Sequence, residues 1–167
     1  MSKHLFIPGP VDVSEDVLEK MGTQQIGHRT KAATALQKSV SEKLQKVFYT
    51  NHLMVVSTSS GSGLMEGAIR SFTKKKAAVF SIGSFGDRWY KMAIANGVAA
   101  DVFKVEPGRH TRVEDVDKAL ATGDYDTITI THNETSSGVM NDVEAIGALL
   151  KEKYPDVLLL VDAVSSM

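Results

Sequence analysis

The chain has 167 residues, enough for one domain with its own core, and it combines 43% hydrophobic residues with a formal net charge of −1. This charge balance gives no reason to expect a nucleic acid or an anionic membrane as the partner. The lack of cysteine excludes disulfides, zinc–thiolate sites and thiol nucleophiles. The first residues carry no apolar stretch of signal-peptide length, so we expect a cytoplasmic protein.

The first fifty residues show no strand alternation. They hold a Pro8-Gly9-Pro10 turn, a predicted helix from about Ser14 to Met21, and a longer predicted helix from about Lys31 to Phe48. We interpret residues 1–50 as an N-terminal arm and helix that we expect to pack on an α/β core.

Apolar, β-branched runs then alternate with amphipathic stretches up to the end of the chain. The predicted strands are residues 53–57, 77–82, 100–105, 127–131 and 157–161, and the predicted helices are 64–72, 85–95, 113–121 and 143–153. Short strands separated by helices of about ten residues indicate βαβ units. The sequence therefore predicts an α/β fold of three layers over residues 51–167, a mostly parallel sheet with helices on both faces. The last strand is apolar throughout, which predicts burial on both sides.

The polar and glycine-rich segments fall where the predicted strands end. They are residues 58–63, 83–86 and 132–138, together with Asp162. Because ligands bind at the carboxyl ends of parallel strands, we expect these four segments to converge on one rim.

Two of these segments suggest binding chemistry, and each has a plainer explanation. Glycines before a predicted helix, as in Ser60-Gly-Ser-Gly63, allow a phosphate to approach free backbone N–H groups, but a structural turn explains them equally well. Asp162 follows a buried strand and must be paired or functional; it is a helix cap, an ion-pair member or a cofactor partner.

The other rim residues leave similar alternatives. Phe85 is a core aromatic or stacks on a flat heteroaromatic ring, and Thr135 caps a turn or donates to a phenolic oxygen. His132 and Glu134 lack further ligands at metal spacing, so no metal site is predicted and a structural role is favoured. His28, in the N-terminal arm, could meet a substrate or a neighbouring subunit.

Six segments together resemble the class V aminotransferases of pyridoxal-phosphate fold type I, in particular the alanine/serine–glyoxylate (serine–pyruvate) group. The segments are PGPVDV (8–13), GHR (27–29), SGSGLMEGA (60–68), GSFGDRW (83–89), HNETSSGV (132–139) and VDAVSSM (161–167). They occur in the family's order and at similar spacing over essentially the whole chain. The resemblance implies pyridoxal 5'-phosphate (PLP) as the cofactor and residues 51–167 as part of the PLP-binding large domain.

The resemblance also assigns residues to the two ends of the cofactor and to the substrate. Ser62, Gly63 and Leu64 match the turn that holds the phosphate by backbone N–H groups and the serine hydroxyl. Gly9 and His28 match segments that line the substrate entrance.

Four further residues match positions around the pyridine ring. Phe85 stands where the family places an aromatic residue, often tryptophan, that stacks on the ring. Thr135 stands where a serine or threonine reaches the ring hydroxyl. Asp162 matches the carboxylate that bonds the pyridinium nitrogen and keeps it protonated, and Val164 matches the residue on the opposite ring face.

The resemblance implies small amino acids and 2-oxo acids as substrates and a homodimer for the full-length parent. The family's Schiff-base lysine lies some tens of residues beyond VDAVSS, and its substrate-carboxylate arginine lies in a C-terminal domain. We therefore expect this N-terminal fragment to lack efficient transaminase activity by itself, because amine transfer needs that lysine as covalent partner and proton carrier.

Two alternatives stay open. One is a cysteine desulfurase-like or lyase member of the same class. The other is a non-catalytic module, either a truncated PLP-binding product or one half of a split protein; exposed apolar surface at the edge of the sheet would distinguish a simple fragment from it.

Overall fold

The computed structural model describes residues 4–7 and 9–167. Pro8 of the predicted turn lies outside the described residues. The chain divides into two compact units, Met1–Val56 and Ser57–Met167.

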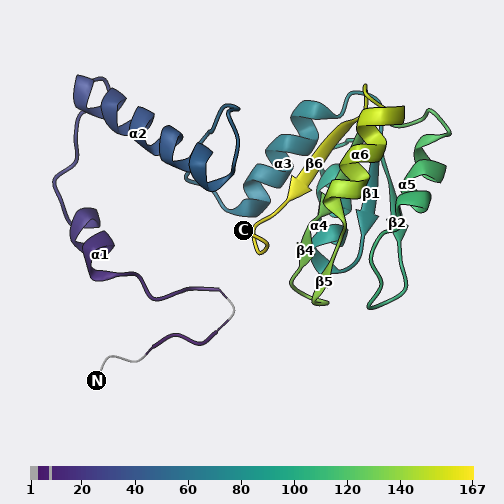
Figure 1. Cartoon of the computed structure of the whole chain (residues 1–167), viewed down its shortest axis with the longest axis horizontal. Helices are drawn as coiled ribbons and strands as arrows, with labels where there is room; N and C mark the ends of the chain where they lie inside the picture. Colours follow the sequence, from purple (N-terminus) through teal and green to yellow (C-terminus); the bar gives the residue numbers. More distant parts are fainter. Residues whose placement is uncertain (1–3, 8) are drawn as a thin grey trace. The chain divides into compact units, whose positions relative to one another are not determined.

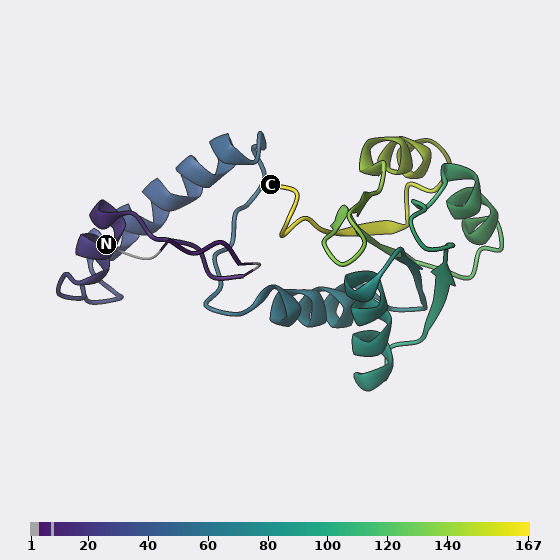
Figure 2. The same ribbon diagram turned by 90° about the horizontal axis from the view of Figure 1, so that it is seen from below.

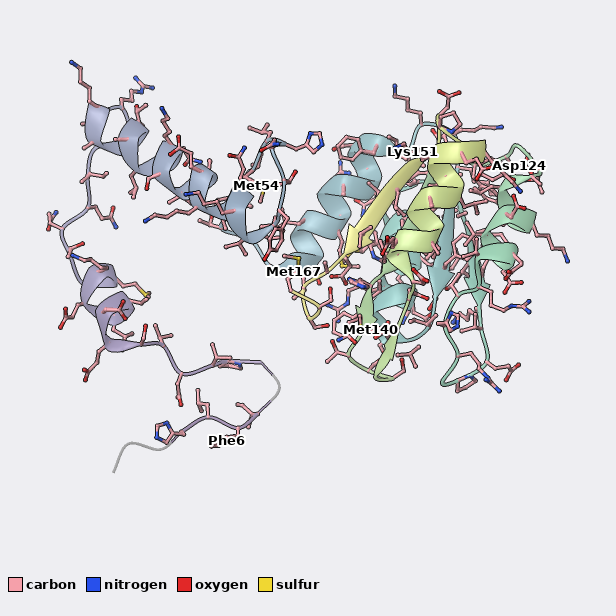
Figure 3. The ribbon with its side chains drawn as sticks, viewed as in Figure 1. Phe6, Met54, Asp124, Met140, Lys151 and Met167 are labelled. Carbon is pink, nitrogen blue, oxygen red and sulfur yellow. The ribbon has the colours of Figure 1, made fainter. Side chains whose placement is uncertain are left out.

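The first unit contains the two helices that the sequence predicts. Helix α1 spans Glu15–Met21 and helix α2 spans Lys31–Val47. The side chain of Thr30 starts α2 by accepting a hydrogen bond from the backbone N–H of Ala33 at 3.2 Å, which satisfies one of the first free donors of the helix. Neither helix buries a residue. The side chain of Phe6, labelled in Figure 3, is 93% exposed.

The second unit is built on a four-stranded sheet in which all pairings are parallel. Its strands are β1 (Ala77–Ser81), β2 (Ala100–Lys104), β3 (Thr127–Thr131) and β6 (Leu158–Asp162), in the spatial order β2-β1-β3-β6. The chain runs from β1 out to β2, returns across β1 to β3, and continues to β6 (Figure 1). The order of the strands therefore reverses between β1 and β3, and their carboxyl ends frame the crevice where ligands of such folds bind.

Helices cover both faces of this sheet. Helices α3 (Gly61–Phe72) and α4 (Ser84–Ala95) lie on one side, and α5 (Val113–Leu120) and α6 (Val143–Lys153) lie on the other (Figure 2). The side chains of β1 alternate between the two layers, because successive residues of a strand point to opposite faces. Ala77 and Val79 pack with α3 and α4, whereas Ala78 and Phe80 pack with α5 and α6. The three-layer α/β prediction is confirmed.

One predicted strand is absent, and the predicted burial of another is wrong. Residues 53–57 form no strand, and Leu53 and Val55 are 84% and 77% exposed. Among the described residues no strand lies beside this segment, and a strand needs a partner for its N–H and C=O groups. Strand β6 forms but is not buried on both faces, since it pairs only with β3 and leaves Leu158 and Val161 exposed. Within the described part of the chain, β6 is an edge strand.

The structure differs from the prediction in two further places. Helix α3 begins at Gly61 instead of Leu64, because the Ser60 side chain accepts from the N–H of Gly63 at 3.3 Å and caps the helix there. The predicted rim loop at 132–138 contains a short hairpin, β4 (Asn133–Glu134) paired antiparallel with β5 (Val139–Met140). In residues 4–7 and 9–167 we find no helix with the length and apolar character needed to cross a membrane.

Gly86 allows α4 to pack closely on β1. A Cβ atom at this position would lie 2.6 Å from Ser81 Cα, and backbone cannot move aside as a side chain can. Gly147 in α6 has free space around it, since a Cβ atom there would meet nothing within 4 Å.

We expect Gly86→Ala to lower the free energy of unfolding by about 1–3 kcal/mol, the range for overpacked cores. Gly147→Ala, the matched control, is expected to raise it by up to about 1 kcal/mol through helix propensity. Urea unfolding followed by the fluorescence of Trp89, the single tryptophan, measures both. A shift of equal sign in the two variants would contradict this account of Gly86.

The carboxylate of Asp126 organises the three-lysine turn before β1. Its Oδ2 accepts from the backbone N–H groups of Lys74 and Lys75 at 2.8 Å each, and its Oδ1 accepts from that of Lys76 at 3.1 Å. Burial acts to raise the pKa of Asp126, but these hydrogen bonds outweigh it and hold the pKa below its usual value.

A carboxylate with a lowered folded-state pKa stabilises the protein above its unfolded pKa of about 3.9, and this stabilisation is lost as the pH falls through the folded value. We expect Asp126→Asn to lower the free energy of unfolding by about 1–3 kcal/mol at pH 7 and by less below about pH 4. Urea titrations at pH 7 and pH 3 test this. The control is Asp124→Asn, which removes the same charge from an exposed neighbouring residue, labelled in Figure 3. A difference from wild type that is independent of pH would contradict the role of the carboxylate.

Candidate functional site

A cavity of about 210 Å³ lies at the carboxyl edge of the sheet in the second unit. Four separate segments line it: the start of α3, the first turns of α4, the hairpin after β3, and the residues that follow β6. The lining residues are Ser60, Gly61, Ser62, Met65, Phe85, Arg88, Asn133, Thr135, Asp162, Val164 and Ser165. A larger hollow of about 1060 Å³ lies beside β2 and α5 and holds none of the predicted site residues.

The start of α3 gives the cavity an anion-binding character. The first backbone N–H groups of a helix lack partners within the helix and carry a partial positive charge. Ser60 takes up two of them, since its carbonyl accepts from Gly63 and Leu64 in addition to the side-chain cap. A Cβ atom at Gly61 would lie 3.1 Å from Val164 Cγ2, so glycine keeps the backbone accessible where the two segments meet.

Arg88 reaches from α4 to α3 across this cavity. Its Nη1 donates a hydrogen bond to Ser62 Oγ at 2.7 Å. Its guanidinium carbon lies 4.9 Å from the centroid of the Phe85 ring, which is within the range of a cation–π contact. The cavity therefore contains a cation, a hydroxyl and an aromatic ring held together.

A buried carboxylate positions the turn that carries Phe85. Glu134 is fully buried, and its side-chain oxygens accept from the backbone N–H groups of Phe85 and Gly86 at 3.0–3.2 Å. They also accept from the hydroxyl of Ser136 at 2.6 Å. The carboxylate thus neutralises the positive end of α4 and ties the hairpin after β3 to the turn after β1. This geometry agrees with the structural role that the sequence favours for Glu134.

The hairpin is also tied to the segment after β6. The hydroxyl of Thr135 donates to Ser165 Oγ at 2.8 Å, and Asn133 Nδ2 lies 3.0 Å from the same oxygen. Asp162 Oδ1 accepts from the backbone N–H of Val164 at 3.1 Å, which turns the chain after the strand. The turn keeps the Asp162 carboxylate at the wall of the cavity.

The structure brings five of the predicted site residues together around the cavity. These are Ser62, Phe85, Thr135, Asp162 and Val164. Gly63 and Leu64 lie on the same turn of α3, but their N–H groups bond to Ser60 and they are not among the lining residues. Gly9 and His28 belong to the first unit, where His28 is exposed, and their substrate role stays a prediction.

Sequence reasoning assigned no role to Arg88, Asn133 or Ser165. Arg88 follows Phe85 by three residues, and this spacing places two side chains on the same helix face, so the helix period could have indicated the pair. Asn133 and Ser165 are 32 residues apart, and no local pattern links them.

Comparison with known proteins decides the family. A model of the family "Aminotransferase class-V" matches residues 12–167. The chain belongs to the class V aminotransferases. An uncharacterized aminotransferase of Methanocaldococcus jannaschii is 38% identical over 170 residues, which cover 100% of this chain and 44% of that protein.

Two further relatives of this class V chain carry more specific names. The serine–glyoxylate aminotransferase of Arabidopsis thaliana is 32% identical, with 98% of this chain and 42% of that protein covered. The crystal structure of an alanine–glyoxylate aminotransferase from Nostoc sp. superposes with a TM-score of 0.87 at 27% identity, covering 99% of this chain and 46% of that one. The chain therefore spans less than half the length of these relatives.

The family implies PLP as the cofactor, and the cavity has the donor set that this molecule needs. A phosphate suits the start of α3 beside Arg88 and Ser62, where donors and positive charge meet. A pyridine ring suits the aromatic face of Phe85 and the carboxylate of Asp162. Glycine at position 61 leaves room between the start of α3, on the phosphate side, and Val164, on the ring side.

We expect Glu134→Gln to lower the free energy of unfolding by about 2–3 kcal/mol, because the new amide group would face the backbone N–H donors of α4. Glu144→Gln is the matched control, since Glu144 lies in the first turn of α6 but is exposed. Its loss is expected to stay below about 1 kcal/mol. Urea unfolding of both variants measures the difference, and similar losses would show that burial of Glu134 is unimportant.

Proposed function

We propose that this chain forms the N-terminal, cofactor-binding part of a PLP-dependent aminotransferase that uses small amino acids with glyoxylate or pyruvate. The observation that supports it most is the meeting of an anion-binding helix start and the Asp162 carboxylate in one cavity. The names of the relatives, serine–glyoxylate and alanine–glyoxylate aminotransferase, favour this choice of substrates.

In this proposal the chain binds the phosphate at the first turn of α3. The Ser62 hydroxyl donates to it, and backbone N–H groups of the turn that includes Gly63 and Leu64 complete the contact. Because the Gly63 and Leu64 N–H groups bond to Ser60 here, their use requires a small rearrangement of that turn.

The remaining cavity residues orient the ring. Phe85 stacks on one face and Val164 packs on the other. Thr135 donates a hydrogen bond to the ring hydroxyl, which requires its hydroxyl hydrogen to turn away from Ser165 Oγ. When bound, PLP supplies a ring that withdraws electrons from the bonds at the α-carbon of an amino acid. Asp162 holds a proton on the ring nitrogen, which strengthens that withdrawal.

Substrate selection involves the first unit in this proposal. Gly9 and His28 match segments that line the family's substrate entrance and are proposed to serve the substrate in the full-length protein. The resemblance implies that the lysine and arginine that complete the reaction come from the remainder of that protein. We therefore expect efficient turnover only from the full-length protein.

The full-length protein is proposed to be a cytoplasmic homodimer. The first unit supports association, because many of its large apolar side chains are exposed, among them Val11 at 73%, Met21 at 75% and Tyr49 at 97%. Exposed apolar groups in such numbers are typical of surfaces that other protein covers.

Binding of pyridoxine 5'-phosphate to the chain, measured by equilibrium dialysis, tests the assignment. This ligand has no aldehyde and cannot react with surface lysines. We expect saturable binding that Asp162→Asn weakens about tenfold, the usual effect of losing a charge-assisted hydrogen bond. Asp156→Asn, which removes the same charge from an exposed turn before β6, should leave binding unchanged.

The proposed substrates are tested in a second experiment on the full-length protein. Serine or alanine is the amino donor, glyoxylate is the acceptor, and the formation of glycine is measured. Equal weakening of pyridoxine 5'-phosphate binding by the two aspartate variants would remove Asp162 from the site. Binding without glycine formation from either donor would contradict the proposed substrates.

A further inference from the structure

Arg88 lines the cavity, yet the family resemblance gives it no role. It lies in the second turn of α4, one turn after Phe85, and its guanidinium extends to the start of α3. In the part of the chain that the structure describes, Arg88 forms no ion pair with a carboxylate. Its positive charge is therefore not neutralised by a neighbouring acid and remains available to an anion.

The contact with Ser62 has a defined direction. A guanidinium can only donate hydrogen bonds, so Ser62 Oγ must accept in the 2.7 Å contact with Arg88 Nη1. A serine hydroxyl has one hydrogen, and that hydrogen must then be donated to some other group. Ser62 lines the cavity, so an acceptor bound there can receive it.

Resting on the proposed function, we propose that Arg88 is a positioning residue that orients the Ser62 hydroxyl as a hydrogen-bond donor to the phosphate of PLP. Arg88 acts through Ser62 and also adds positive charge beside the start of α3, where the helix already favours an anion. The Phe85 ring, 4.9 Å from the guanidinium carbon, limits the positions that the side chain adopts.

The phosphate dependence of this role separates it from a general effect on the cavity. Pyridoxine 5'-phosphate and pyridoxine share the ring and differ in the phosphate. If Arg88 acts on the phosphate, its replacement weakens the binding of pyridoxine 5'-phosphate alone. If the replacement alters the shape of the cavity, the binding of both ligands is weakened. Equilibrium dialysis of both ligands against wild type and Arg88→Gln therefore gives the required readout without any turnover.

We expect Arg88→Gln to weaken pyridoxine 5'-phosphate binding about tenfold, in line with a charge-assisted hydrogen bond, and to change pyridoxine binding by less than about twofold. Arg70→Gln is the matched control, since Arg70 is an exposed arginine in the last turn of α3, paired with Glu66. It removes the same charge from the same unit and should change neither affinity. Trp89 fluorescence checks that each variant is folded.

A double variant tests whether Arg88 acts through Ser62. Ser62→Ala removes the hydroxyl, and adding Arg88→Gln to it is expected to weaken pyridoxine 5'-phosphate binding by less than about threefold more. A full tenfold further loss would overturn the action through Ser62.

Other results would also overturn the proposal. Equal losses for the two ligands would make Arg88 a residue that only shapes the cavity. Tighter binding of pyridoxine by Arg88→Gln would mean that the guanidinium competes with the pyridine ring for Phe85. A wild-type chain that binds neither ligand contradicts the proposed function itself, whereas normal binding by both wild type and Arg88→Gln contradicts only the role of Arg88.

Discussion

The buried carboxylate of Glu134 is the interaction on which the rim of this fold depends. It joins the hairpin after β3 to the first turn of α4, which follows β1. A fully buried charge is unfavourable unless hydrogen bonds compensate it, and here the helix start and Ser136 supply them. Because β1 and β3 are the strands between which the sheet reverses its order, this one side chain links the two segments that flank the crevice where ligands of such folds bind.

The remaining rim contacts build outward from that point. The turn that Glu134 holds carries Phe85, and the helix that follows carries Arg88, which reaches to Ser62 at the start of α3. On the other side, the hairpin contacts Ser165 after β6 and so approaches the segment that begins with Asp162. Segments up to about a hundred residues apart thus surround one small cavity with a cation at one part of its wall and a carboxylate at another. This separation of charge suits a ligand with an anionic group and a protonated ring.

The regular elements could be predicted because local patterns determine them. Four of the five predicted strands and all of the predicted helices form, since β-branched runs favour strands and apolar residues at helical spacing favour helices. Residues 53–57 have the composition of a strand but lack a neighbouring strand among the described residues, so their backbone groups have no ladder to join. The burial of strand β6 could not be predicted for a similar reason. Hydrophobic residues indicate that a strand favours burial, but they do not indicate whether another element covers it.

The sequence by itself determined the alternation of strands and helices, the parallel sheet, and the family to which the motifs belong. It also placed Phe85, Thr135, Asp162 and Val164 on one rim, because the carboxyl ends of parallel strands share an edge. Ser62 lies on the same rim at the start of α3, although the strand predicted before it does not form. Only the tertiary structure decided that Glu134 is buried against α4, that Arg88 contacts Ser62, and that Ser165 contacts the hairpin. The residues in these pairs are separated by 26 to 48 positions in the sequence, and their geometry depends on how whole elements pack. Hydrophobic spacing encodes which face of an element is buried, but not which polar side chain of another element it will meet there.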